Sequence, residues 1–381
     1  MDWLLSCLHC GNSTSPSGMP TVCTCGEPWV VEYPSRAPGL LERAELRRHA
    51  GLWRFRAFLP LQPDESPVTL GEGDTPLLAL ERTGRRLGAP QLLLKDESVN
   101  PTGSFKARGL SAAVTRAAAA GATGFVLPTA GNAGIAAAAY GARAGLPVQV
   151  FAPAWTPPRL VEQMRRFGAE VTLVDGHIGV CGAAARTFAA ERGWTDLSTL
   201  KEPYRIEGKK TLGLEIAMQL GWALPSAVIY PTGGGTGLIG MWRAFAQLRE
   251  LGWVKDDMPR LFSVQSEGCA PVVRAWEEAA ESVSPWPDPD TSAFGLRVPA
   301  PLGGRLMLRA LRDSGGGALA VTDAELRAMA ERVTRDEGID LSPEGGASLV
   351  AVDHLVASGA LGAGDRIVAF NTGAGWLYRD G

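Results

Sequence analysis

The sequence lacks the features that would direct a protein to a membrane or to a nucleic acid. Its formal net charge is only −3 over 381 residues, and no long run of Lys or Arg occurs, so no general attraction to polyanions is expected. Met1–Cys7 forms neither a basic region nor an apolar stretch of signal-peptide length. The Ala-rich stretch 112–144 contains Arg116 and Arg143 and does not fit a membrane span. We therefore expect a cytoplasmic protein that binds neither nucleic acid nor membrane.

A disulfide framework and a hydrolase triad are not expected either. The chain has six cysteines, of which four lie in the first 25 residues while Cys181 and Cys269 stand alone. Disulfide frameworks normally serve small secreted domains, whereas a chain of this length can bury a large core, so reduced thiols are predicted. The four histidines are isolated and suggest no Ser-His-Asp set: His9, His49, His177 and His354.

Composition changes divide the chain into three parts. Residues 1–35 form a short segment rich in Cys, Gly, Ser, Thr and Pro. Residues 36–72 read as a linker, beginning with the Pro- and Gly-containing stretch 34–39, followed by a polar, Arg-rich helix near 40–50 and a loop at 60–67. Residues 73–381 form the main body, in which apolar runs alternate with helical patterns.

That alternation predicts an α/β fold with a parallel sheet covered on both faces. The predicted strands are 91–95, 124–127, 148–151, 171–174, 227–230, 261–264 and 366–370. The predicted helices include 107–120, 134–144, 158–167 and 212–220. No internal repeat of fixed period is present, and the proline-containing stretch 282–292 is predicted to be an irregular loop.

A glycine-rich loop follows the predicted strand at 227–230 and precedes a helix. It contains Gly233, Gly234, Gly235, Thr236 and Gly237. Glycines let backbone N–H groups converge on an anion, and the helix N-terminus adds a partial positive charge, so phosphate is the natural ligand. A simple tight turn is the alternative. No Lys-Ser or Lys-Thr follows the glycines as in a Walker A loop, and the dinucleotide-type spacing lacks a suitably placed acidic residue.

Lysine is scarce, with six in the whole chain, and one of them occupies a distinctive position. Lys106 follows Asn100–Phe105 and begins a long Ala-rich helix. A helix N-terminus and partial burial both disfavour the ammonium form, and a neutral amine is what Schiff-base chemistry requires. An ordinary surface lysine in a first helical turn is the alternative.

Two further loops follow predicted strands. Asn132 lies in the loop Thr129–Gly134, where small residues allow a ligand to approach and the side-chain amide can bond a hydroxyl or cap the helix. Thr372 follows the last strand and places a hydroxyl at the strand end where open α/β sheets bind ligands. Simple turns are again the alternative.

Taken together and in this order, these motifs closely resemble the fold-type II pyridoxal phosphate enzymes, and within them a threonine synthase-like branch. The motifs that carry the resemblance are Asn100–Lys106, Ala130–Gly134, Gly233–Gly237 and Thr372-Gly373, supported by Gly73–Leu77, Glu207–Glu215 and Ser342–Ala347. The resemblance implies a two-lobed parallel-sheet fold, with a smaller lobe at about 115–200 and the larger lobe formed by the remainder of 73–381. It also implies a lyase that acts on a small amino acid, in a family whose members are often homodimers.

The resemblance also implies residue roles. Lys106 would bind pyridoxal 5′-phosphate and then move protons, Gly233 to Gly237 would hold the cofactor phosphate, and Asn132 would contact the ring 3-hydroxyl. Thr372 would face the pyridine nitrogen, where a neutral hydroxyl moderates the electron sink. The residues implied at the substrate are Ser104, Thr129, Ala130, Gly131, Asn132 and Ala133.

The substrate implied by the branch is O-phosphohomoserine, converted with water to threonine and phosphate. Many threonine synthases carry hydroxyl residues in the asparagine loop that help to bind the substrate phosphate, where this chain has Ala130, Ala133 and Gly134. A serine or threonine dehydratase and a β-replacing synthase on the same scaffold therefore remain alternatives. A non-catalytic binding module is a third alternative, which the presence of Lys106 and the glycine loop disfavours.

The N-terminal cysteines resemble two zinc knuckles, as found in this branch. Cys7 and Cys10 have the usual two-residue gap, whereas Cys23 and Cys25 have only one residue between them. A tetrahedral site with four thiolates would stabilise a segment that has too little core of its own. The sequence thus predicts a zinc-ribbon-like segment with a structural Zn²⁺, with four free thiols as the alternative.

Overall fold

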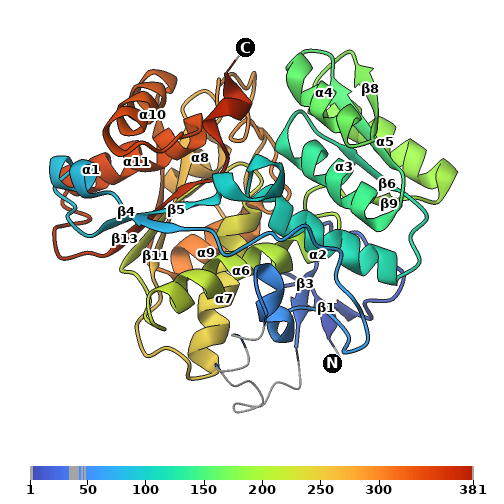
Figure 1. Ribbon diagram of the computed structural model, residues 1–381, viewed down its shortest axis with the longest axis horizontal. Coiled ribbons are helices and arrows are strands. Elements are labelled where there is room, and N and C mark those ends of the chain that lie inside the picture. Colours follow the sequence, from blue (N-terminus) through green and yellow to red (C-terminus); the bar gives the residue numbers. More distant parts are fainter. Residues whose placement is uncertain (1–2, 34–42, 44–45, 47–48, 380–381) are drawn as a thin grey trace. The chain divides into compact units, whose positions relative to one another are not determined.

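The computed structural model describes residues 3–33, 43, 46 and 49–379 (Figure 1). Contacts group the chain into two compact units, each assembled from three stretches. Unit 1 comprises Met1–Asp74, Asn100–Thr102 and Lys106–Thr211, and unit 2 comprises Thr75–Val99, Gly103–Phe105 and Leu212–Gly381. The predicted linker at 34–39 and most of the predicted helix near 40–50 lie outside the described residues.

Unit 1 begins with a small antiparallel sheet of order β2-β1-β3. Its strands are β1 (Leu4–Ser6), β2 (Ser13–Thr14) and β3 (Val30–Glu32). Leu5 pairs with Val31, and both side chains are fully buried. Two tight turns flank this sheet, closed by hydrogen bonds from Gly11 N–H to the Cys7 carbonyl (3.0 Å) and from Gly26 N–H to the Cys23 carbonyl (2.8 Å). These turns carry the four cysteines.

Unit 1 also contains a four-stranded parallel sheet of order β8-β7-β6-β9. The strands are β6 (Phe125–Pro128), β7 (Val148–Pro153), β8 (Glu170–Val174) and β9 (Thr195–Asp196). The helices of this unit are α2 (Lys106–Ala119), α3 (Asn132–Ala144), α4 (Pro158–Arg166) and α5 (Ile178–Arg192), together with the 3₁₀ turn Leu52–Phe58. β7 is buried along its whole length, as its continuous apolar pattern predicts.

Strand β8 departs from the expectation of a buried strand. The apolar run at 171–174 does form a strand, but Thr172 and Leu173 are exposed. The reason is that β8 pairs only with β7 and lies at the edge of the sheet within the described chain. An edge strand is covered less than a central one, and sequence alone does not reveal which strand takes that place.

Helix α6 (Tyr204–Gln219) begins well before the predicted start at 212. The segment 204–211 contains Glu207, Lys209 and Lys210, whose charges argued against a buried helix in the sequence. In the structure all three side chains are buried, and Lys210 donates a hydrogen bond to Glu207. Pairing of opposite charges one helical turn apart therefore permits the burial that the composition disfavoured.

Unit 2 contains a six-stranded sheet of order β12-β11-β10-β13-β5-β4, in which only the β4–β5 pair is antiparallel. Its strands are β4 (Leu77–Ala79), β5 (Leu92–Asp96), β10 (Ala227–Pro231), β11 (Arg260–Ser266), β12 (Gly317–Val321) and β13 (Ile367–Asn371). Val228 of β10 lies opposite Val368 of β13, and both strands are completely buried.

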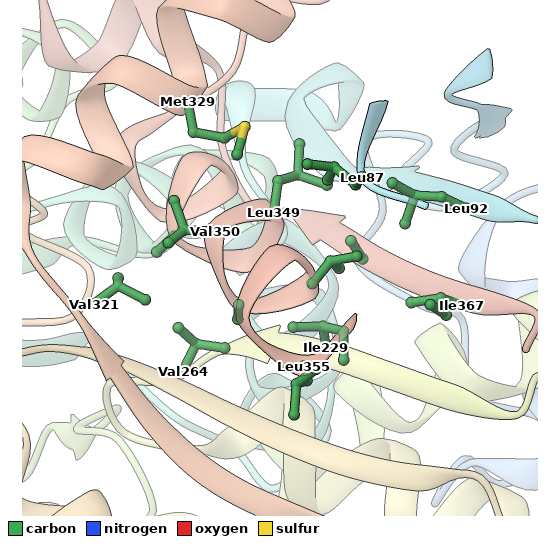
Figure 2. Packing of buried hydrophobic residues seen from close by; sticks show 14 of the residues in the cluster. Leu87, Leu92, Ile229, Val264, Val321, Met329, Leu349, Val350, Leu355 and Ile367 are labelled. Atoms are coloured by element: carbon green, nitrogen blue, oxygen red, sulfur yellow. The ribbon is translucent and has the colours of Figure 1, made fainter. Parts of the chain in front are cut away.

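The helices of unit 2 cover this sheet. They are α1 (Glu81–Arg86), α7 (Thr236–Glu250), α8 (Pro271–Glu277), α9 (Gly304–Asp313), α10 (Asp323–Glu337) and α11 (Pro343–Ala357), with short 3₁₀ turns at Glu97–Val99, Pro101–Gly103 and Gly375–Tyr378. Figure 2 shows Leu349 and Leu355 of α11 in the main core, near Ile229 of β10. Each such buried aliphatic side chain stabilises the fold by about 1.5–3 kcal/mol.

The predicted strands and helices of the main body are thus present with shifts at their ends. The stretch 282–292 is irregular, as predicted. Within the described residues, no helix is both long enough and apolar enough to cross a membrane.

Candidate functional site

In unit 2 the glycine loop and Thr372 follow adjacent strands. β10 ends at Pro231 and leads into the glycine loop, while β13 ends at Asn371 and is followed by Thr372. The two strands are parallel neighbours, so both segments leave the sheet at the same edge. The chain proceeds from β10 to β11 on one side, whereas β13 and β5 lie on the other. This is the kind of switch point at which open α/β sheets bind ligands.

The glycine loop is held by close packing. Gly235 has a φ of 76° and forms the N-cap of α7, and no described side chain caps that helix end. A Cβ at Gly233 would overlap the carbonyl oxygen of Gly295, one at Gly235 would overlap the Met307 side chain, and one at Gly237 would overlap the Tyr230 hydroxyl. The loop therefore excludes side chains at three positions. An uncapped helix N-terminus in a glycine loop suits a phosphate group.

The segment immediately before Lys106 is bonded to the end of β13. Phe105 N–H donates to the Thr372 carbonyl at 3.0 Å, and Ala374 N–H donates to the Gly103 carbonyl at 2.9 Å. The Phe105 and Tyr230 rings meet edge to face with centroids 6.1 Å apart. Lys106 is the next residue along the chain and the first residue of α2.

Two features of the Asn100–Phe105 loop point to a ligand. The Ser104 hydroxyl is fully buried and has no hydrogen-bond partner among the described residues. Thr102 adopts a φ of 67°, which is strained for a β-branched residue. Buried polar atoms normally have partners, and backbone strain concentrates at functional sites. The residues present thus fit a bound cofactor that carries a phosphate and polar ring substituents.

In unit 1, Asn132 is the first residue of α3, which packs against α2. The loop before it is shaped by Thr129, whose hydroxyl accepts a hydrogen bond from Gly131 N–H at 3.2 Å. Gly131 is the N-cap of α3, and no described side chain caps that end. The predicted site residues of unit 1 therefore lie on two packed helices and the loop after β6.

Gly134 in the first turn of α3 is fixed by its neighbours. A Cβ at this position would lie 2.6 Å from Cγ2 of Thr129 and 2.8 Å from both Sδ and Cε of Met164. Met164, on α4, is fully buried. A hydroxyl side chain at position 134 therefore has no space, because Met164 fills it. Sequence reasoning missed Met164, since nothing in the pattern of α4 separates this residue from an ordinary core methionine.

The four N-terminal cysteines form one cluster. Their Sγ atoms all lie within 4.8 Å of one another, with Cys7–Cys25 and Cys10–Cys23 both at 3.5 Å. Tetrahedral zinc with Zn–S bonds of about 2.3 Å requires sulfur separations of about 3.8 Å. The short gap between Cys23 and Cys25 does not prevent convergence. A hydrogen bond with the Cys25 backbone lowers the pKa of the Cys23 thiol to about 6, which favours the thiolate that binds metal.

Tyr230 is a second residue that the sequence analysis did not single out. It is buried beneath the glycine loop and packs edge to face against Phe370 with ring centroids 5.1 Å apart. Its position in strand β10 gave the only available signal, a bulky aromatic followed by Pro231 and the loop. Its hydroxyl explains why residue 237 must be glycine.

The comparisons with known proteins agree with this geometry. The family model described as "Pyridoxal-phosphate dependent enzyme" matches residues 68–373. A threonine synthase of Methanosarcina acetivorans is 32% identical over 371 residues, covering 97% of this chain and 91% of that relative. A threonine synthase of Methanocaldococcus jannaschii is 32% identical and covers 98% of this chain and 92% of its own.

Solved structures confirm the predicted fold. Threonine deaminase isoform 2 from Solanum lycopersicum matches with a TM-score of 0.69 at 21% identity, covering 93% of this chain and 95% of that chain. A fungal L-serine ammonia-lyase from Rhizomucor miehei matches with a TM-score of 0.68 at 22% identity, covering 81% of this chain and 95% of that chain. At these identities the likeness concerns the fold alone. The family model and the threonine synthase relatives together show that this chain belongs to the pyridoxal phosphate-dependent enzymes, as a threonine synthase-like lyase.

Proposed function

We propose that the chain converts O-phosphohomoserine and water to threonine and phosphate. The observation that carries this proposal is the likeness to relatives named threonine synthase over nearly the whole chain, including the cysteine segment. The placement of the glycine loop and Thr372 at one sheet edge of unit 2 supports it, because a phosphate-bearing cofactor fits there.

The proposed residue roles follow from these positions. When bound, pyridoxal phosphate withdraws electrons from the α-carbon of the amino-acid substrate. Lys106 provides the amine that attaches the cofactor and then accepts and returns protons at the substrate carbons. The amides of Gly233 to Gly237 bind the cofactor phosphate, with Thr236 at the first turn of α7. Thr372 offers a neutral hydroxyl to the pyridine nitrogen, and Asn132 contacts the ring hydroxyl.

The substrate carboxylate is assigned to the loop that leads into α3. Thr129, Ala130, Gly131, Asn132 and Ala133 present small side chains and uncapped amides there. The buried Ser104 hydroxyl is assigned to the same substrate. The N-terminal amides of α3 stabilise an anion without requiring a basic side chain.

A second candidate is a lyase or β-replacing synthase that acts on an unphosphorylated amino acid. The packing of Gly134 against Thr129 and Met164 favours it, because this packing removes the space for a hydroxyl that could bind a substrate phosphate. The two candidates share the cofactor, Lys106 and the glycine loop. They differ only in the group that leaves the substrate.

We further propose that Cys7, Cys10, Cys23 and Cys25 bind a structural Zn²⁺. The convergence of the four sulfur atoms supports this assignment. Four thiolates fill a tetrahedral site and leave no open position, so the ion would stabilise the segment and take no part in the reaction.

Absorption spectra of the purified protein test the function. We expect a visible cofactor band that O-phosphohomoserine shifts while phosphate is released. Lys106→Ala should lack this band, whereas Lys255→Ala, which removes an exposed lysine of unit 2, should keep it. A band that responds only to L-serine or L-threonine, with ammonia and a 2-oxoacid released, would establish the second candidate. No band after addition of pyridoxal phosphate would refute both.

A further inference from the structure

The cysteine segment, residues 3–33, touches the remainder of unit 1 through a buried charge cluster. The Tyr33 hydroxyl donates to Oε2 of Glu207 at 2.5 Å, and Nζ of Lys210 donates to the same oxygen at 2.5 Å. Nζ of Lys210 also lies 4.6 Å from the centroid of the Tyr33 ring. Glu207 and Lys210 are almost completely buried, so solvent screens this cluster little.

A second contact lies at the other end of the cysteine segment. The Arg116 guanidinium of α2 is 4.7 Å from the Trp3 ring centroid and 5.9 Å from that of Tyr204, the first residue of α6. Arg116 also forms an ion pair with Glu65. Trp3 is 4% exposed, so its contact with the guanidinium is shielded from water. The cysteine segment therefore contacts α2 at one point and α6 at another.

The helices that it contacts touch each other close to Lys106. A Cβ at Gly208 of α6 would overlap the Arg108 carbonyl and lie 2.9 Å from Cα of Gly109 in α2. A Cβ at Gly109 would in turn lie 3.1 Å from Cε of Lys209. The two helices thus meet backbone to backbone in the first turn of α2, which begins at Lys106. A shift of α6 at this contact moves the backbone that carries Lys106.

From these contacts we infer that metal binding at the four cysteines and cofactor binding at Lys106 are coupled. This inference rests on the proposed metal site and on the proposed role of Lys106. The cysteine segment has a small core, so metal loading determines how firmly it is ordered. An ordered segment holds Tyr33 on α6 and Trp3 on α2, and so fixes the helix contact beside Lys106. Glu207 and Tyr33 act as positioning residues here.

Coupling between two binding sites is reciprocal, and this provides a strict test. If zinc strengthens cofactor affinity by some factor, the cofactor strengthens zinc affinity by the same factor. Cofactor affinity is measured by titrating cofactor-free protein with pyridoxal phosphate, with zinc bound or removed by a chelator. Zinc affinity is measured by competition with a colour-forming chelator, with and without pyridoxal phosphate. We expect the two factors to agree and to be at least about 5-fold.

Tyr33→Phe is the informative variant, because it removes one hydroxyl and keeps the ring. We expect it to bring the coupling factor close to 1 while zinc still binds. The matched control is Tyr140→Phe, since the Tyr140 hydroxyl donates to buried Glu72 at the same 2.5 Å within unit 1 without joining the cysteine segment to α6. Tyr140→Phe should lose stability but keep the coupling factor.

The outcomes separate the claims. A cofactor band whose affinity is the same with and without zinc overturns the coupling alone. So does unchanged coupling in Tyr33→Phe, or a native protein whose cysteines bind no zinc. Failure to bind pyridoxal phosphate in any metal state overturns the proposed function and the coupling together.

Discussion

Replacing Gly134 by alanine tests whether Met164 determines the residue at that position. Glycine in a helix interior is normally less favourable than alanine by about 1 kcal/mol, so the substitution would usually stabilise a helix. At Gly134 the new Cβ would lie 2.6 Å from Cγ2 of Thr129 and 2.8 Å from Sδ and Cε of Met164. Met164 is fully buried and cannot swing into solvent. The sign of the effect should therefore reverse.

The expected magnitude follows from two opposing terms. Overpacking a buried site costs about 1–3 kcal/mol, and the gain in helix propensity of about 1 kcal/mol offsets part of this. We therefore expect Gly134→Ala to lower the free energy of unfolding by about 1 kcal/mol. Gly182→Ala in α5 is the matched control, because its Cβ would meet nothing closer than 3.7 Å. That control should gain about 0.5–1 kcal/mol.

Urea unfolding followed by circular dichroism measures both variants, and a double variant completes the test. Met164→Ala alone should cost about 2–5 kcal/mol, because it leaves a cavity. In Gly134→Ala/Met164→Ala the new methyl enters the vacated space, so the double variant should lose less stability than the sum of the two single losses. A stabilising Gly134→Ala, or strictly additive losses, would refute the packing argument.

The same double change has a functional reading. Gly134→Ser/Met164→Ala provides a hydroxyl and the space for it beside Thr129. If such a hydroxyl is what a substrate phosphate needs, kcat/KM for O-phosphohomoserine should rise relative to that for L-serine. No change in this ratio would show that position 134 does not select the substrate.

Two further predictions concern buried charges. Nζ of Lys95 donates to the Thr75 carbonyl (2.7 Å), Oε1 of Glu215 (2.6 Å) and Oε1 of Gln219 (2.8 Å), with Lys95 and Glu215 fully buried; Lys95→Met should therefore cost about 3–5 kcal/mol in urea unfolding, and an equally low stability of Lys95→Met/Glu215→Gln would contradict the role of the stranded carboxylate. Burial raises the pKa of the Glu202 carboxyl from 4.5 to about 8, although Arg205 lowers it. Because the folded protein keeps a proton that the unfolded chain releases, stability should fall between pH 4.5 and about 8, with a slope of up to about 1.4 kcal/mol per pH unit from this group. Glu202→Gln should flatten that slope, and an unchanged pH profile would show that Glu202 does not titrate in this range.

Much of the candidate site could be read from the sequence because its signals are local. The glycine loop, the Thr372 segment and the Lys106 helix each combine special residues with a strand end or a helix start. These combinations reflect backbone requirements within a few residues, such as a positive φ at Gly235 or an uncapped amide end. The order of the motifs along the chain then indicated the family, which the comparisons confirm.

The sequence by itself thus determined the fold class, most elements of the main body and the loops at their ends, since periodicity and turn chemistry act over short distances. Only the tertiary structure decided that β8 is an edge strand and that charged residues 204–211 continue a buried helix. It alone brought Met164 against Gly134, and Tyr33 to Glu207 across 174 positions. Such pairings depend on which surfaces meet after the chain has folded, and a side chain's partner far along the chain leaves no periodic trace in the sequence around it.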